Sequence, residues 1–199
     1  MNWKILLNPF EKHSEKALLL FGIIMTFLGS FIAYLTKSRF DGVIDMHVVD
    51  QITFLEPLVD NLLNTLLLFL LFYLLGKRIN NKTRWVDILS VSIISRIPFY
   101  VLPLFNIDGL LAKITEKILN GIDLQNLSQP PVIEFSDLII LLVFAMVTVL
   151  CLAWFIALLW NGFRVATNTK GTKNIVLFIV FLLLSEALSK ILISTLNFY

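Results

Sequence analysis

Long apolar stretches alternate with short polar ones along this chain, and their lengths predict membrane-spanning helices. A helix needs roughly 20 apolar residues to cross a hydrocarbon layer about 30 Å thick. Five stretches meet or approach this length, at residues 17–35, 58–75, 85–105, 136–160 and 175–196. Because lipid offers no partners for backbone polar groups, such stretches must be helical. We therefore predict an all-α fold, an integral membrane bundle of five transmembrane helices.

Two shorter segments have the pattern of amphipathic helices that lie at the membrane interface. Asn8-Pro9-Phe10-Glu11 places an N-cap residue, a proline and a glutamate in the order that begins a helix, so we expect a helix over residues 9–16. In residues 108–120, leucines and isoleucines recur at helical spacing opposite lysines and a glutamate, which predicts a second such helix. This second helix either caps the bundle or forms a lid over a cavity.

Composition agrees with one membrane domain over residues 1–199. The chain is 58% hydrophobic, which is more than a soluble domain with a single core requires. The first apolar stretch is too long for a signal peptide and no small-x-small cleavage site follows it, so we expect it to be retained. The net charge is only +2, and the basic residues lie in short loops beside the spans, so we expect no nucleic-acid partner.

Lysines and arginines gather on one side of the predicted topology. They precede the first span, separate the second span from the third, and separate the fourth from the fifth, where the basic loop contains Arg164, Lys170 and Lys173. The positive-inside rule then places the N-terminus in the cytoplasm and the C-terminus outside. Topology alone explains a basic loop, and such a loop can also bind anionic lipid headgroups.

Charged and polar side chains inside the predicted spans form the candidate site. A charge in mid-bilayer costs at least about 2.5 kcal/mol, so such residues face protein or water. At about 1.5 Å per residue, Arg96 and Glu186 lie level with each other near the membrane centre, and Lys190 follows Glu186 by one helical turn. We predict that spans two, three and five meet, with Arg96 paired to Glu186 and Lys190 near Asp60 or Asn64.

This intramembrane polar cluster has two interpretations. In one, the Arg96–Glu186 pair only holds the bundle together, and Lys190 can extend to the outer surface. In the other, the charges line a cavity or an ion path. Pro98 and Pro103 each remove a backbone donor and are expected to act as a hinge in the third span. Some transporters build their sites beside helices broken in this way.

No motif for catalysis, cofactor binding or metal binding occurs in the sequence. It contains no GxGxxG or GxxxxGK[ST] phosphate loop and no GxSxG nucleophile elbow. Cys151 is the only cysteine, and His13 and His47 fall on opposite sides of the predicted membrane. We therefore expect no catalytic residues, no cofactor and no metal site.

The sequence as a whole resembles the Yip family of five-span membrane proteins, in its bacterial form. The resemblance rests on Trp3 followed by Asn8-Pro9-Phe10-Glu11, on Arg96-Ile97-Pro98 in the third span, and on residues 160–173 before the last span. It implies a compact helical membrane domain, often self-associating, in the bacterial inner membrane. The Asp-Leu-x-Gly-Pro motif and the long cytoplasmic N-terminal region of eukaryotic members are missing, so the resemblance does not imply a Rab-type GTPase partner.

These observations lead to two functional hypotheses. The first is a non-enzymatic membrane protein that organises the membrane or binds lipids, copies of itself or other membrane proteins. The second is a small oligomeric transporter or channel whose polar path is lined by the charged residues of spans two, three and five.

Overall fold

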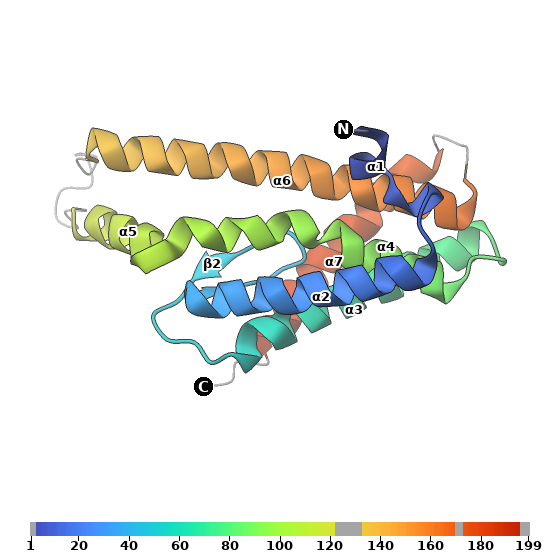
Figure 1. Cartoon of the computed structure of the whole chain (residues 1–199), viewed down its shortest axis with the longest axis horizontal. Coiled ribbons are helices and arrows are strands. Elements are labelled where there is room, and N and C mark those ends of the chain that lie inside the picture. Colours follow the sequence, from blue (N-terminus) through green and yellow to red (C-terminus); the bar gives the residue numbers. More distant parts are fainter. Residues whose placement is uncertain (1–2, 122–132, 170–172, 196–199) are drawn as a thin grey trace.

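The computed structural model of this chain describes residues 3–121, 133–169 and 173–195, which form an elongated helical bundle (Figure 1). Within these residues, five helical stretches are long and apolar enough to cross a membrane. The predicted all-α membrane bundle is therefore confirmed. The helical elements, with 3-10 helices written η, are α1 (Trp3–Leu7), η1 (Pro9–Glu11), α2 (Glu15–Leu35), α3 (Leu55–Ile79), α4 (Trp85–Ser95), η2 (Ile97–Gly109), α5 (Leu110–Asn120), α6 (Phe135–Thr167) and α7 (Lys173–Thr195).

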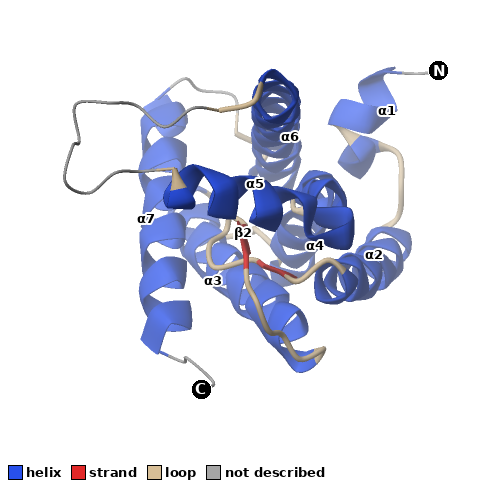
Figure 2. Ribbon diagram, turned by 90° about the vertical axis from the view of Figure 1, so that its left-hand side faces the viewer, coloured by secondary structure: helices blue, strands red, loops and turns tan. Residues whose placement is uncertain are grey.

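The bundle has two ends with different chemistry. We call the end where α2, α4 and α7 begin the basic end, because Lys16, Lys77, Arg78 and Arg84 lie at helix termini there. At the other end, which we call the loop end, two short strands, β1 (Ser38–Arg39) and β2 (His47–Val48), pair antiparallel between α2 and α3. Helix α7 crosses α3 obliquely, whereas α2, α4 and α6 run along the bundle (Figure 2).

The third span changes helix type at Arg96. Helix α4 ends at Ser95, and the chain continues as η2 (Ile97–Gly109), whose backbone leaves helical geometry at residues 106–108. Pro98 lacks the amide hydrogen that an α-helix needs and its ring would clash with the preceding turn, so the chain winds more tightly from this point. Pro103 lies inside η2. This span is the most central of the five, because 72% of its most apolar 18-residue stretch is buried inside the protein.

The segment predicted as a surface helix over residues 9–16 is not one helix, and this prediction was wrong. Pro9–Glu11 form only a 3-10 turn, and the chain turns again before α2. Ser14 caps α2 by accepting a hydrogen bond from the Ala17 amide at 3.4 Å, so this N-cap begins a new helix instead of extending the first. The preceding helix α1 packs on α6, where the Trp154 indole donates to the Leu6 carbonyl at 2.9 Å.

The second amphipathic segment forms helix α5, which lies across the loop end of the bundle (Figure 2). A left-handed turn at Asp108 and Gly109, with φ of 55° and 72°, separates α5 from η2. Leu111 and Ile114 on its apolar face are buried. Lys117 on its polar face donates to Asp137 at the start of α6, at 3.1 Å. Helix α5 therefore caps this end of the bundle.

A glycine allows α2 to approach η2 closely. A Cβ atom at Gly29 would lie only 2.7 Å from a ring carbon of Tyr100, a separation that real side chains do not adopt. Three residues earlier, the Thr26 hydroxyl lies 3.2 Å from the Tyr100 hydroxyl, within hydrogen-bonding distance. Small residues at such crossings let helix backbones come together in membranes.

Replacing Gly29 with valine is expected to lower stability by about 1–3 kcal/mol, because the added carbons must displace the Tyr100 ring from a packed interface. Thermal unfolding of the purified protein in detergent measures the loss. Ala145→Val places the same valine side chain at an exposed position on α6 and serves as the control. Equal melting temperatures for the two variants would contradict the close approach.

Candidate functional site

The segment between α2 and α3 enters the bundle instead of lying on its surface. We call residues 36–54 the inserted loop. Strand β1 leads the chain into the bundle, β2 leads it out again, and residues 40–46 between them form the tip of the loop. Phe40 and Val43 in the tip are each only 1% exposed. Non-helical backbone is tolerated at membrane depth only where protein or water satisfies its polar groups. The partners of the tip backbone therefore define the site.

Arg96 lies directly against the tip, with its side chain fully buried. Its Nη1 donates to the Val43 carbonyl at 2.6 Å, and its Nη2 donates to Oδ1 of Asn61 at 3.0 Å. The guanidinium carbon lies 6.0 Å from the centroid of the Phe40 ring, a cation–π contact. Asn64, one turn along α3 from Asn61, donates to the Phe40 carbonyl at 2.7 Å. Thus α3 and the end of α4 bind the carbonyl groups of the tip.

Helix α7 binds the amide groups of the same tip. The Val43 amide donates to the Ser189 hydroxyl at 3.2 Å, and the Ile44 amide donates to Oε2 of Glu186 at 2.9 Å. Gly42 makes this approach possible, since a Cβ there would lie 2.8 Å from the carboxyl carbon of Glu186. Side chains from three spans therefore satisfy both donors and acceptors of one short piece of main chain.

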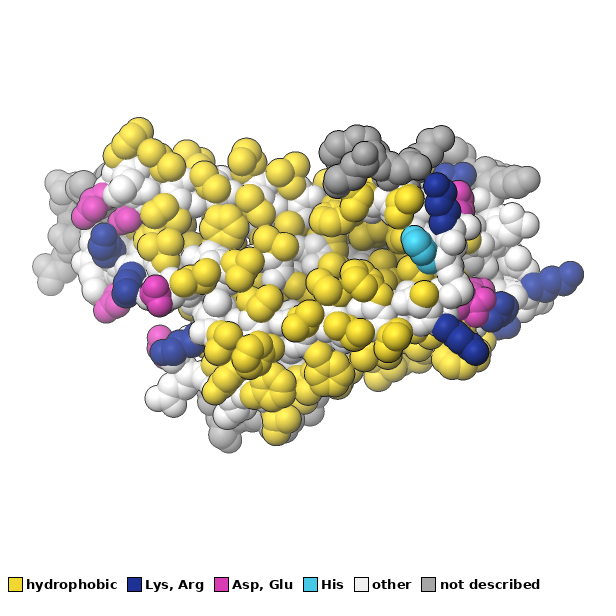
Figure 3. Space-filling model, in the orientation of Figure 1, with side chains coloured by type: hydrophobic (Ala, Val, Ile, Leu, Met, Phe, Trp, Pro, Cys, Tyr) yellow, Lys and Arg dark blue, Asp and Glu magenta, His cyan; other side chains and the backbone are white. Residues whose placement is uncertain are grey.

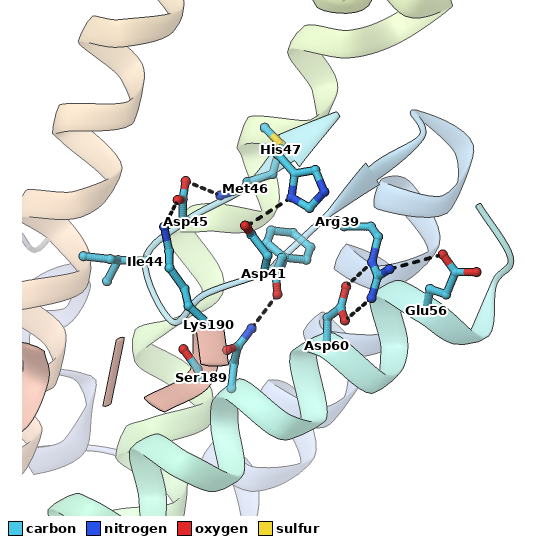
Figure 4. A network of polar contacts seen from close by, with 12 residues as sticks. Arg39, Asp41, Ile44, Asp45, Met46, His47, Glu56, Asp60, Ser189 and Lys190 are labelled. Carbon is cyan, nitrogen blue, oxygen red and sulfur yellow. Dashed lines mark hydrogen bonds and ion pairs between the residues drawn. The ribbon is translucent and has the colours of Figure 1, made fainter. Parts of the chain in front are cut away.

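Ion pairs surround the inserted loop nearer the loop end (Figure 4). Arg39 makes two hydrogen bonds to the two oxygens of Asp60, at 2.9 and 2.8 Å, and lies 3.7 Å from Glu56. Asp60 is 1% exposed, so this two-pronged contact takes place away from solvent. Paired, charge-assisted bonds of this geometry are among the strongest polar contacts in proteins. They attach the first strand of the loop to α3.

A second group of ion pairs joins the loop to α7 and to itself. Lys190 forms an ion pair with Asp45 of the tip and lies 3.6 Å from Glu186 on its own helix. His47 of β2 lies 3.1 Å from Asp41 across the loop (Figure 4). Arg39, Asp41, His47 and Lys190 also border a cavity of about 370 Å³ at the loop end.

The contact between Asp41 and His47 shifts the pKa of both groups. Burial raises the pKa of Asp41, but the hydrogen bond and the charge of His47 outweigh it and leave the pKa below its ordinary value of 3.8. The hydrogen bond to Asp41 raises the pKa of His47 above its ordinary value of 6.5. Each group therefore favours the charged form of the other.

The structure changes the predicted pairing of the intramembrane polar cluster. The predicted Arg96–Glu186 ion pair is wrong: among the described residues, no carboxylate lies within ion-pair distance of Arg96. Lys190 contacts Asp45 rather than Asp60 or Asn64, so this prediction was wrong as well. The physical reason is the same in both cases. The inserted loop occupies the space between the helices and becomes the partner of each side chain.

Several residues of the site could not be inferred from their place in the sequence. Arg39 and Ser189 bind Asp60 and the Val43 amide, yet neither stands out in the pattern of apolar and polar positions. Asn61, by contrast, is a polar residue just inside the predicted second span, next to Asp60. One feature of the sequence does indicate an inserted loop. The apolar residues Phe40 and Val43 lie in a loop rich in aspartate, and their side chains are more stable when buried.

The predicted basic loop lies apart from this site. Arg164 is exposed near the end of α6 at the basic end. Lys170 lies outside the described residues, and Lys173 is the first residue of α7.

Fold and site together define a multi-pass membrane protein with a loop held inside its helical bundle by buried polar side chains. No family model, curated protein or solved structure matches this chain.

Replacing Arg96 with leucine is expected to be strongly destabilising, since each buried acceptor left without a donor costs about 1–3 kcal/mol and two are lost. Adding Glu186→Leu should lower stability further, because that carboxylate serves the Ile44 amide and not Arg96. Unfolding in detergent gives the stability, and tryptic cleavage after Arg39 reports release of the loop. Arg164→Leu is the matched control. Recovery of stability in the double variant would instead support a direct pair.

The Asp41–His47 contact predicts a pH-dependent stability. The contribution of His47 is present below its ordinary pKa and is lost as pH rises through the raised value, while that of Asp41 is lost as pH falls through the lowered value. His47→Gln should therefore lower the melting temperature at about pH 5.5 more than at about pH 9. The effect is below about 1 kcal/mol because both side chains are partly exposed. An equal loss of melting temperature at the two pH values would contradict the contact.

Proposed function

We propose that this chain is a non-enzymatic multi-pass membrane protein that organises the membrane by binding lipids or partner proteins. One observation carries the proposal: the buried polar cluster is engaged in holding the inserted loop. Arg96 is 0% exposed, and it, Asn64 and Glu186 each contact the main chain of the tip. Groups that are occupied in this way support a structural role for the charges over a path for ions.

We further propose that the chain belongs to the Yip class and lies in a bacterial inner membrane with its basic end in the cytoplasm. The sequence resemblance and the concentration of lysines and arginines at that end support this assignment. Self-association, or association with other membrane proteins, is part of the same proposal. Helix α6 supports this association. It is 33 residues long, and only 11% of its most apolar 18-residue stretch is buried inside the protein.

A second candidate, a small oligomeric transporter or channel, is favoured by one observation. The cavity of about 370 Å³ at the loop end is bordered by charged residues, as a vestibule would be. A path continuing from it would have to pass the inserted loop and Arg96, and therefore requires the loop to move.

Reconstitution into vesicles tests both candidates. The proposed function predicts that vesicles with the purified protein release K⁺, Cl⁻ and protons no faster than empty vesicles, while the protein retains membrane lipid through detergent purification. Flux that is present in the wild type and in Arg164→Leu, but lost in a folded Glu186→Gln variant, would establish the second candidate instead. Glutamine is chosen because its side-chain oxygen can still accept from the Ile44 amide.

A further inference from the structure

A groove opens on the side of the bundle near the basic end. It consists of two adjoining cavities of about 480 and 450 Å³, which share His13 and Leu18. Helices α1, α2, α4 and α6, together with η1, form its walls. The space-filling view shows a hollow among hydrophobic side chains, with a histidine and several charged side chains beyond it (Figure 3).

The larger cavity is apolar. Its walls include Leu6 of α1, Phe21 of α2, Ile94 of α4, and Trp154 and Leu158 of α6. Since it extends past the end of α4, the two cavities together follow most of that helix, a distance of about 15 Å. The apolar cavity forms the deeper part of this groove, and its lining fits a hydrocarbon chain and offers little to a polar solute.

The adjoining cavity, which we call the polar cavity, is lined by both polar and apolar residues, and its charged residues are of both signs. Asp87 and Ser90 lie on its α4 side, and His13 and Lys16 lie at the start of α2. Among the described residues, the Asp87 carboxylate has neither a hydrogen bond nor an ion pair, and Lys16 has no carboxylate partner. Glu15 also lines the cavity, but it is paired with Arg84. The charge of the nearby Arg84 acts on Asp87 without forming an ion pair with it. The cavity therefore offers a carboxylate and an ammonium group that no neighbouring side chain pairs directly.

The position of the polar cavity matches the level of lipid headgroups. Trp85 begins α4 two residues before Asp87 and is exposed, as tryptophans at the membrane–water interface are. The apolar cavity lies deeper, toward the middle of the spans. The groove thus has the same order of polar and apolar chemistry as a phospholipid in the surrounding leaflet.

We propose that this groove binds one phospholipid with a primary-amine headgroup, of the phosphatidylethanolamine class. An acyl chain occupies the apolar cavity, His13 and Lys16 face the phosphate, and Asp87 accepts hydrogen bonds from the ammonium group. Phosphatidylcholine has no N–H donor for Asp87, and phosphatidylglycerol has no cation, so both bind more weakly. The inference rests on the proposed lipid-binding function and names its ligand.

Native mass spectrometry of the purified protein, given equal amounts of the three phospholipids, tests the proposal. The wild type should retain phosphatidylethanolamine preferentially. Asp87→Asn should weaken this binding roughly tenfold, as expected for one lost charge-assisted hydrogen bond. Asp50→Asn removes an exposed carboxylate at the loop end and should have no effect.

A second pair of variants tests the apolar cavity. Ala17→Phe fills the groove and should reduce retention of all three lipids, whereas Ala145→Phe adds the same group to an exposed face of α6 and should not. Melting temperatures of the four variants show that each is folded.

The outcomes separate the inference from the function on which it rests. Equal retention of the three lipids, unaffected by Asp87→Asn, would overturn the headgroup assignment and indicate only the general lipid layer around the bundle. Preferential retention of phosphatidylglycerol would overturn it in favour of an anionic lipid and leave lipid binding intact. Loss of every lipid from the wild type would contradict the proposed function itself.

Discussion

The hydrogen bonds between buried side chains and the main chain of residues 40–44 are the contacts on which the rest of this bundle depends. A non-helical segment inside a membrane protein leaves amides and carbonyls that water cannot reach. Here Arg96, Asn64, Ser189 and Glu186 supply the missing partners from three different spans. The relative positions of α3, α4 and α7 therefore follow from the path of the loop as much as from contacts between the helices.

This arrangement also explains how a membrane protein retains a fully buried arginine. The charge of Arg96 is stabilised by a carbonyl oxygen, an amide oxygen and an aromatic ring in place of a carboxylate. The carboxylate predicted at the same depth, Glu186, accepts from a backbone amide and lies near Lys190. Each of these two charged groups therefore has its own direct hydrogen-bond partners. The change to 3-10 winding after Arg96 marks the point at which α4 stops and the chain continues past the loop.

The spans could be predicted from the sequence because their cause is local. A run of apolar residues long enough to cross lipid must be helical, whatever surrounds it, and helical rise alone places Arg96 and Glu186 at one depth. Boundaries were less accurate where local signals are weak. Helix α6 continues to Thr167, beyond the predicted end at residue 160, because polar residues such as Asn161 and Arg164 can extend a helix into the headgroup layer.

The partners of the buried residues could not be predicted, because they depend on a segment whose sequence is typical of an exposed loop. Asp41, Asp45 and Asp50 gave residues 36–54 the appearance of a solvated connection, while burial of Phe40 and Val43 draws the tip inward. Two oppositely charged side chains at one depth then suggested an ion pair, the simplest way to neutralise both. Knowledge of what lies between the helices was required to see that each had a different partner.

Holding a loop through its main chain has a consequence for how this protein changes over evolutionary time. The bundle holds Val43 and Ile44 through backbone atoms that all amino acids share, so substitution by another apolar residue leaves these two hydrogen bonds in place. The helix residues Arg96, Asn64 and Glu186 bind the loop through their side chains, so replacing one of them removes its hydrogen bond. Related chains are then expected to keep the arginine, the asparagine and the glutamate on their three helices, and to vary more in the apolar side chains at residues 43 and 44.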